Sequence, residues 1–127
     1  MRFTETDMAN RSKAKGTSFE TSIKNYLNDS GFKKAHRTAL TGGDDAGDIH
    51  GIERPDGHKV IIQCKNQKKH DLSGWLDATV EQASRADDAV PALVVKRAGK
   101  GEKALGDSYV VMRLSDFVDL IQEADYS

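Results

Sequence analysis

The stretch TGGDDAGDIHGIERPDGHKVIIQCK, residues 41–65, determines the fold that we expect for this chain. Its first part, Thr41–Gly47, is rich in glycine and aspartate, which is typical of a loop. Asp48–Glu53 and Lys59–Lys65 are rich in β-forming residues, and the Arg-Pro-Asp-Gly segment between them is typical of a tight turn. The stretch therefore predicts a loop followed by two strands joined by a turn.

The two strands would bring three polar side chains together. Alternate side chains of a strand share a face, so Gln63 and Lys65 point to the same side of the sheet. If the strands pair across the turn, Asp48 lies beside both residues. Hard cations such as Mg²⁺ take oxygen ligands from carboxylates and amides, and an ammonium group can orient water or hold a phosphate. The combination suits metal-assisted hydrolysis of a phosphodiester.

The rest of the chain predicts a single domain over residues 16–127, preceded by a flexible basic arm over residues 1–15. Thr17 is expected to cap a helix that stops at Gly31. The later patterns predict, in order, a strand over 33–40, the two strands above, a helix from 72 to about 87, a strand over 90–97, a loop over 98–107, a strand over 108–113 and a helix from 115. This α-β-β-β-α-β-β-α order predicts an α/β domain in which the second helix connects two parallel strands.

Composition narrows the class of protein. The 127 residues carry a net charge of -1 and a single cysteine, Cys64, so no internal disulfide can form and a cytoplasmic setting is expected. We expect no membrane association, because no apolar run approaches the ~20 residues that span a bilayer. Residues 1–70 carry 13 Lys and Arg against 9 Asp and Glu, whereas residues 71–127 carry 6 against 11. A basic half can bind a polyanion, although chance segregation of solvated charges would give the same pattern.

Several short motifs follow one another in an order that resembles a known superfamily. They are Lys15-Gly16 before a helix with Glu20, then Gly31-Phe32, His36-Arg37, Gly42-Gly43, Gly47–Gly51 and Ile61–Lys65. Together they resemble the PD-(D/E)xK nucleases, and within them the archaeal-type Holliday-junction resolvases and their phage relatives. The resemblance implies a restriction-endonuclease-like αβββαβ core with a mixed central sheet, here followed by an extra strand and helix. It also implies a homodimeric endonuclease of a bacterial, archaeal or phage-infected cell, which cleaves branched DNA with Mg²⁺, or with Mn²⁺ as a substitute.

The resemblance also assigns roles to individual residues. The family's helix glutamate falls on Glu20, its aspartate on Asp48 and its lysine on Lys65, so we expect these residues and Gln63 to be catalytic. Glu20, Asp48 and Gln63 would bind the metal. Two positions depart from the usual pattern: Gly47 replaces a proline, and Gln63 replaces an acidic residue, as in Mrr-like restriction nucleases. A glutamine can still coordinate a cation, but it removes one negative charge from the site.

Each of these residues also has a simpler explanation. Glu20 stands three residues after Thr17 and could complete a capping box at the start of the helix. Asp48 could merely close a turn. Gln63 and Lys65 could lie on the solvated face of an edge strand.

DNA contacts and rival functions complete the expectations. Lys15, Arg37, Lys68 and Lys69 are predicted to contact DNA phosphates, which positions a duplex without reading its sequence. Lys68 and Lys69 could equally be an exposed run of charge. Two other functions stay open at this point. One is an Mrr-like or repair endonuclease that acts on duplex DNA, and the other is a DNA-binding module without catalytic activity.

Overall fold

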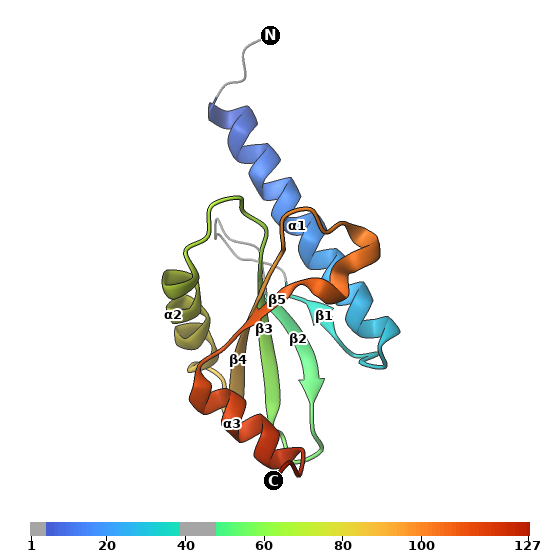
Figure 1. Ribbon diagram of the computed structural model, residues 1–127, viewed down its shortest axis with the longest axis vertical. Helices are drawn as coiled ribbons and strands as arrows, with labels where there is room; N and C mark the ends of the chain where they lie inside the picture. The colour runs from blue at the N-terminus through green and yellow to red at the C-terminus, as the bar shows by residue number, and fades with distance from the viewer. Residues whose placement is uncertain (1–4, 39–47) are drawn as a thin grey trace.

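The computed structural model describes residues 5–38 and 48–127 of the chain (Figure 1). Its elements are α1 (Glu5–Asp29), β1 (His36–Arg37), β2 (Asp48–Glu53), β3 (Lys59–Lys65), α2 (Leu72–Ala83), β4 (Ala89–Val95), the 3₁₀ helix η1 (Glu102–Asp107), β5 (Tyr109–Val111) and α3 (Leu114–Glu123). The predicted order of helices and strands is confirmed, with η1 added before β5. The strands β2 and β3 have the predicted bounds, and the predicted loop over 41–47 lies outside the described residues.

The five strands form one mixed sheet in the order β1-β2-β3-β4-β5. Neighbouring strands run antiparallel except β3 and β4, which are parallel and are connected by α2. This is the crossover that the sequence predicts, and the α/β fold class is confirmed. The arrangement is compatible with a restriction-endonuclease-like core. In the described part of the chain, no helix is both long and apolar enough to span a membrane.

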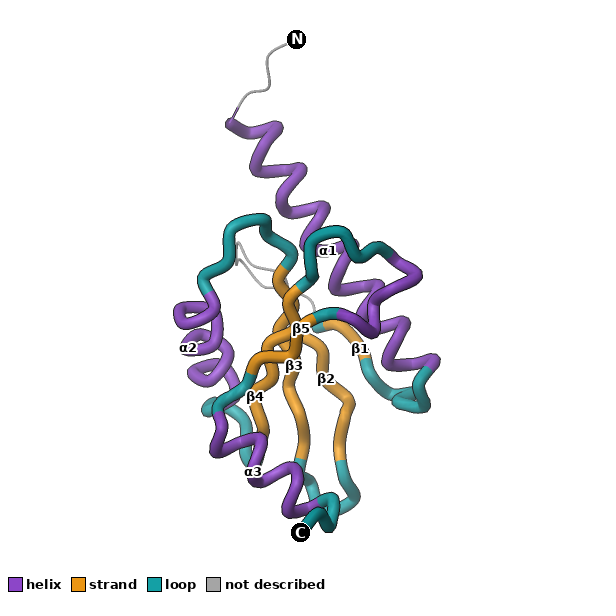
Figure 2. Tube along the Cα trace, viewed as in Figure 1, coloured by secondary structure: helices purple, strands orange, loops and turns teal. Residues whose placement is uncertain are grey.

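The two faces of the sheet carry different helices (Figure 2). On one face, Phe19 and Ile23 of α1 belong to the same buried cluster as Ile49, Ile62 and Val94 of the sheet. Side chains alternate along each strand, so Gln63, between Ile62 and Cys64, faces the other side and meets α2 there. The polar face of β3 is therefore covered by α2, and its apolar face by α1.

An apolar groove lies on the face that carries α1. Its lining includes residues of α1, the sheet strands, the β5 region and α3, among them Leu27, Ile62, Val94, Met112 and Phe117. Several apolar side chains along its C-terminal border are exposed, including Leu114 at 75% and Val110 at 63%. The C-terminal strand and helix thus form one wall of an apolar surface rather than a closed extension of the core.

The first helix is longer than the sequence analysis predicts. Helix α1 begins at Glu5, so the predicted flexible arm is helical over residues 5–15, and the predicted start at Thr17 is wrong. Residues 5–15 contain good helix formers and no proline, which favours helix without any apolar periodicity. The periodicity is missing because this half of α1 projects beyond the sheet (Figure 1). Since Thr17 lies inside the helix, the capping-box explanation of Glu20 no longer holds.

Three other boundaries differ from the predictions. Of the predicted strand over 33–40, residues 39 and 40 lie outside the described residues, and β1 covers His36–Arg37 of the rest. Helix α2 ends at Ala83 instead of near 87, and β5 covers three residues instead of six. Residues 30–35 form turns that reverse the chain after α1, and Asn28 donates hydrogen bonds to the backbone oxygens of Phe32 and Ala35 there. These side-chain contacts replace strand pairing over the first part of the predicted segment.

A bulge in β2 brings the α1–β1 segment close to the sheet. Asp48 and Ile49 pair with Gln63 and Ile62, but Ile52 pairs with Val60, so β2 contains one extra residue. Gly51 lies in this bulge with a φ of +90°. A Cβ atom at this position would overlap the backbone carbonyl of Lys34. The close approach therefore requires glycine, and it places β1 beside the start of β2.

We predict that Gly51→Ala strongly destabilises the fold, by more than about 4 kcal/mol, because backbone atoms and not a flexible side chain occupy the space of the new methyl group. Gly57→Ala is the matched control, since Gly57 has a similar φ of +92° but open space around it. The backbone strain alone should cost about 1–2 kcal/mol there. Urea unfolding measures both values, and equal losses in the two variants would contradict the role assigned to Gly51.

Candidate active site

The candidate site lies where β2 begins and β3 ends. Asp48, the first residue of β2, is the register partner of Gln63 in β3, and Lys65 is the last residue of that strand. Glu20 approaches from α1, and its charge and that of Lys65 both act on Asp48. The structure thus brings together the four residues that the sequence analysis selects.

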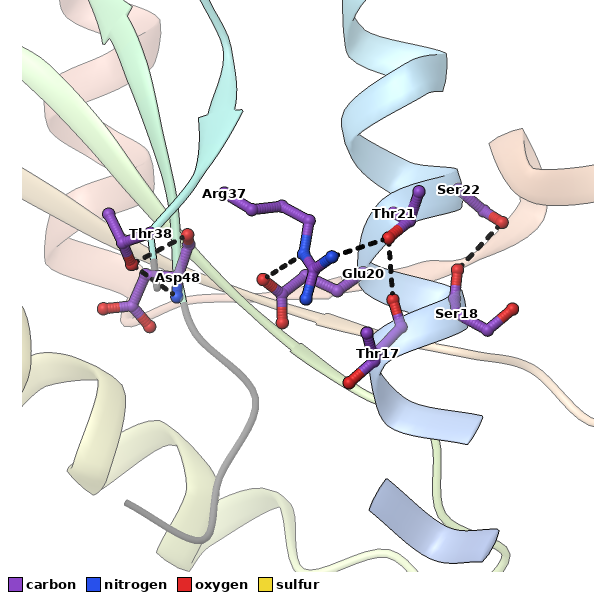
Figure 3. A network of polar contacts seen from close by, with 8 residues as sticks. All are labelled: Thr17, Ser18, Glu20, Thr21, Ser22, Arg37, Thr38 and Asp48. Atoms are coloured by element: carbon purple, nitrogen blue, oxygen red, sulfur yellow. Dashed lines mark hydrogen bonds and ion pairs between the residues drawn. The ribbon is translucent and has the colours of Figure 1, made fainter. Parts of the chain in front are cut away.

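Glu20 is fully buried, and hydrogen bonds from the described residues reach one of its two carboxylate oxygens. Its Oε1 atom accepts a hydrogen bond of 2.9 Å from Arg37 Nε, and Arg37 Nη1 donates another of 2.9 Å to Thr21 Oγ1 (Figure 3). The second carboxylate oxygen, Oε2, is buried with no hydrogen-bond partner among the described residues. Burial raises the pKa of Glu20 above its ordinary value, against the lowering effect of the hydrogen bond and charge of Arg37. The arginine therefore fixes one oxygen and leaves the other available for a ligand.

Asp48 is held by its backbone, not by its side chain. Its N–H donates to Thr38 Oγ1 at 3.2 Å (Figure 3), and its carbonyl accepts from the Thr38 N–H at 3.0 Å. The side chain is only 5% exposed, and its Oδ1 atom is buried without a hydrogen-bond partner in the described part of the chain. Burial, followed by the nearby charge of Glu20, raises the pKa of Asp48 to about 6, while Lys65 opposes this rise. The protein therefore holds a second carboxylate in a setting that disfavours its charge.

His50 lies close to the Asp48 carboxylate. Its Nε2 atom lies 3.8 Å from Asp48 Oδ2. Burial and the charges of His36 and Lys59 lower the pKa of His50 below its ordinary value, which weakens His50 as a counter-ion for Asp48. The charge of Lys65 is the one that opposes the raised pKa of Asp48.

Gln63 contacts a threonine that the sequence analysis does not single out. Gln63 is 5% exposed, and its Oε1 atom accepts a hydrogen bond of 2.6 Å from Thr79 Oγ1 of α2. Thr79 Oγ1 also lies 2.8 Å from the carbonyl oxygen of Trp75, one turn earlier in the helix. In the sequence, Thr79 is one polar residue in an otherwise apolar helix face, and this irregularity was the only available signal of its role.

Lys65 lies beside an aromatic ring at the end of β3. Its Nζ atom is 5.9 Å from the centre of the Trp75 ring, within the range of a cation–π contact. Trp75 in turn lies against His70, at 5.9 Å between ring centres. Because Lys65 and Gln63 share one face of β3, the ammonium lies on the side of the sheet that carries the carboxamide and the Asp48 carboxylate.

The donor set fits a divalent cation with oxygen ligands. Two buried carboxylate oxygens, Glu20 Oε2 and Asp48 Oδ1, lack partners within the described chain, and oxygens of this kind are the ligands that Mg²⁺ takes. Gln63 could add an amide oxygen. The described residues contain no cluster of three or more His, Cys, Asp or Glu side chains that could hold a metal ion.

The predicted DNA contacts lie in different settings. Arg37 is engaged by Glu20 and Thr21, which gives it a structural task besides any contact with DNA. Lys15 and Lys68 line a basic hollow, and Lys69 is exposed. Contact of these four residues with DNA stays a prediction. Cys64 is buried, and burial raises the pKa of its thiol, as expected of an inert core cysteine.

Comparison with known families identifies the type of protein. The model of a family described as "Phage putative PDDEXK endonuclease" matches residues 11–127, nearly the whole chain. The chain belongs to this family. No curated protein and no solved structure gives a significant match. The predicted membership of the PD-(D/E)xK nucleases is thereby confirmed, and this membership implies that the chain is a nuclease. The resemblance to Holliday-junction resolvases in particular stays a prediction.

We predict that the metal-free endonuclease becomes less stable as the pH rises. The pKa of Asp48 is about 6 in the folded state, against 3.8 for an ordinary aspartate. Between these values the folded state binds more protons than the unfolded state, so the free energy of unfolding falls as the pH rises from about 4 to 6. At neutral pH the loss amounts to about 3 kcal/mol.

The Asp48→Asn variant tests this directly. In EDTA at pH 7.5 it should be more stable than the wild type, and the difference should shrink towards zero as the pH approaches 4. Asp77→Asn, an exposed substitution on α2, is the control and should keep the wild-type pH dependence. Urea unfolding across this pH range provides the values. Parallel curves for Asp48→Asn and the wild type would show that the charged form of Asp48 does not destabilise the folded protein.

Proposed function

We propose that this PDDEXK endonuclease is a Mg²⁺-dependent homodimer that cleaves phosphodiester bonds in branched DNA such as four-way junctions, with Mn²⁺ as a substitute for Mg²⁺. Such an activity belongs to DNA recombination and repair in the cytoplasm of a bacterial, archaeal or phage-infected cell. The observation that supports the catalytic part most strongly is the pair of unpartnered buried oxygens, Glu20 Oε2 and Asp48 Oδ1, near Lys65. An arrangement of this kind is costly to the empty protein and is useful only with a cation bound.

The roles of the residues follow from their positions. A bound Mg²⁺ would lower the pKa of a coordinated water and offset charge that develops on the phosphate. Glu20 and Asp48 hold the cation, and Arg37 keeps Glu20 in the orientation that exposes Oε2 to it. Lys65, at the open end of β3, orients the attacking water or holds the phosphate that is cut.

Gln63 would be the third metal ligand, and Thr79 sets the orientation of its amide. A hydroxyl has a single hydrogen, yet two acceptor positions lie within reach of Thr79 Oγ1, at Trp75 O and at the Gln63 amide. In the structure Thr79 Oγ1 donates to Gln63 Oε1, and this amide oxygen has a second lone pair that would be available to the cation. Thr79 is therefore a positioning residue for the ligand that replaces the usual acidic side chain.

We predict that Thr79→Val weakens Mn²⁺ binding by at least about tenfold, as is typical when a residue behind a metal ligand is lost. Thr79→Ser keeps the hydroxyl and should retain an affinity close to that of the wild type. Isothermal titration of Mn²⁺ into metal-free protein measures both affinities without any need for turnover. Thermal melts in EDTA provide the check that both variants are folded. Equal affinities for Thr79→Val and Thr79→Ser would exclude the positioning role.

A second copy of the chain is the occupant that we propose for the apolar groove between α1 and α3. Val110 is exposed in β5, which is an edge strand of the sheet, and Leu114 and Phe117 are exposed beside it on α3. Apolar side chains in such numbers are typical of a surface that is covered in an oligomer. A two-fold dimer would carry two active sites, as is needed for paired cuts in symmetric strands of a junction.

The proposed substrate is tested by incubating the protein with a synthetic four-way junction and with a linear duplex of the same sequence, in Mg²⁺ or in EDTA. We expect paired, symmetric nicks in the junction alone, and only with Mg²⁺. Single uncoupled nicks would contradict the homodimer. Equal cutting of both substrates would indicate a nuclease for duplex DNA, and binding without cutting in either Mg²⁺ or Mn²⁺ would indicate a DNA-binding module without catalytic activity.

Two variants test the site itself within this assay. Asp48→Asn and Lys65→Ala should each reduce cleavage by at least about a hundredfold, because each removes a group that acts on the reacting phosphate or its cation. Junction binding should stay close to the wild-type value. Asp77→Asn and Lys103→Ala make the same chemical changes at exposed positions and should cut normally. Cleavage that survives in Asp48→Asn or Lys65→Ala would disprove the assignment.

A further inference from the structure

A basic hollow lies beside the active site and is not used by the catalytic residues. Three separate segments line it: α1, the loop after β3 and the loop after β4. Its cations are Lys15, Lys68, Lys96, Arg97 and Lys100, and no Asp or Glu belongs to its lining in the described part of the chain. We propose that this hollow binds the phosphate backbone of DNA next to the phosphate that is cut. The proposal rests on the function proposed above and specifies how the substrate strand is held.

The hollow is joined directly to the catalytic lysine. Strands β3 and β4 are parallel and in register up to Lys65 and Val95, so their loops leave the sheet at the same end (Figure 2). The next residue, Lys96, donates its backbone N–H to the carbonyl oxygen of Lys65 at 3.0 Å. Neighbouring strands are about 4.8 Å apart, and each strand of DNA carries a charge about every 3.4 Å along the helix axis. A strand whose phosphate reaches Lys65 therefore has its adjacent phosphates within range of the hollow.

The arginine of the hollow is held in a fixed position. The guanidinium of Arg97 lies 5.1 Å from the centre of the Tyr109 ring, and its Nη1 atom donates to the Asp107 carbonyl at 3.4 Å. A guanidinium fixed against an aromatic ring loses little freedom when it binds, and its planar donors match the oxygens of a phosphate. Arg97 is therefore placed to bind the anionic oxygens of a phosphodiester.

The backbone of the loop after β4 also allows a close approach. Gly99 has a φ of +77°, and neither Gly99 nor Gly101 has any atom within 4 Å of a Cβ position. A ligand can therefore lie against the main chain there. Lys100 is paired with Asp107 at 3.5 Å, but both side chains are substantially exposed, so this ion pair contributes little and does not compete strongly with a phosphate.

The spread of the five cations over three segments indicates a polymer rather than a single phosphate. A lone phosphate would be enclosed by a few groups, whereas this hollow is open and lined by charges from distant parts of the chain. Contacts with phosphates do not read the bases, so the hollow would bind DNA of any sequence. Lys15 and Lys68 are predicted DNA contacts from the sequence, and the structure adds the β4 loop to them.

The test compares two pairs of lysines in the full-length protein. Lys96→Gln/Lys100→Gln removes two charges from the hollow. Lys33→Gln/Lys34→Gln removes two exposed charges from the turn after α1, more than about 20 Å along the helix from Lys15. Binding of a fluorescent junction and duplex is measured by anisotropy from 50 to 300 mM salt in the Asp48→Asn background, so that no substrate is cut.

The hollow variant should bind at least about tenfold more weakly than its parent at 100 mM salt. Its slope of log affinity against log salt should be shallower by about 2, because two phosphate contacts are lost. The control pair should change affinity less than twofold. With Asp48 intact, the hollow variant should raise KM more than it lowers kcat. An affinity and slope unchanged from the parent, or losses equal to those of the control pair, would overturn the proposal.

The outcomes separate this proposal from the proposed function. A wild-type protein that cuts no DNA but binds it through the hollow would refute the nuclease activity and leave the hollow in place. A protein that cuts DNA with its affinity unaffected by the hollow variant would refute the hollow alone. If Lys96→Gln/Lys100→Gln does not fold, as judged by thermal melting, Lys68→Gln/Lys100→Gln removes two charges from the same hollow and leaves Lys96, the residue after β4, unchanged.

Discussion

The arrangement of the site depends on the burial of two carboxylates, those of Glu20 and Asp48, close enough to each other for the charge of Glu20 to act on Asp48. Arg37 reaches one oxygen of Glu20, while Glu20 Oε2 and Asp48 Oδ1 remain buried and unpartnered among the described residues. Burial disfavours a charged carboxylate, and two such groups near each other disfavour it further. A structure that keeps them in place must hold them by other means, and here the backbone does so.

Two features of the backbone supply that rigidity. The bulge at Gly51 lets the segment after α1 approach β2, which places Arg37 within reach of Glu20. The backbone of Asp48 is tied to Thr38 on the neighbouring segment. The backbone of Asp48 is thus fixed by its contact with Thr38, and the carboxylate of Glu20 is held through Arg37.

The sequence predicts β2, β3 and their register well because their patterns are local. Both strands have clear β-forming runs, and the turn between them fixes which residues face each other. The helical residues before Thr17 could not be predicted from periodicity, because their sequence has no apolar repeat. The pairing of Arg37 with Glu20 joins residues 17 positions apart, and the contact of Thr79 with Gln63 joins α2 to the sheet. Such contacts depend on how the helices dock, which no local pattern reveals.

The glutamine at position 63 changes the charge that the site presents to its substrate. With Glu20, Asp48, Arg37 and Lys65 all ionised, the positive and negative charges of the side chains balance. A divalent cation would then leave an excess of two positive charges, whereas an acidic residue at position 63 would leave one. The scissile phosphate and its leaving group are anionic, so in the proposed site the neutral amide would weaken metal binding and strengthen the attraction of the nucleic acid. The glutamine would therefore shift electrostatic attraction from the cofactor to the substrate.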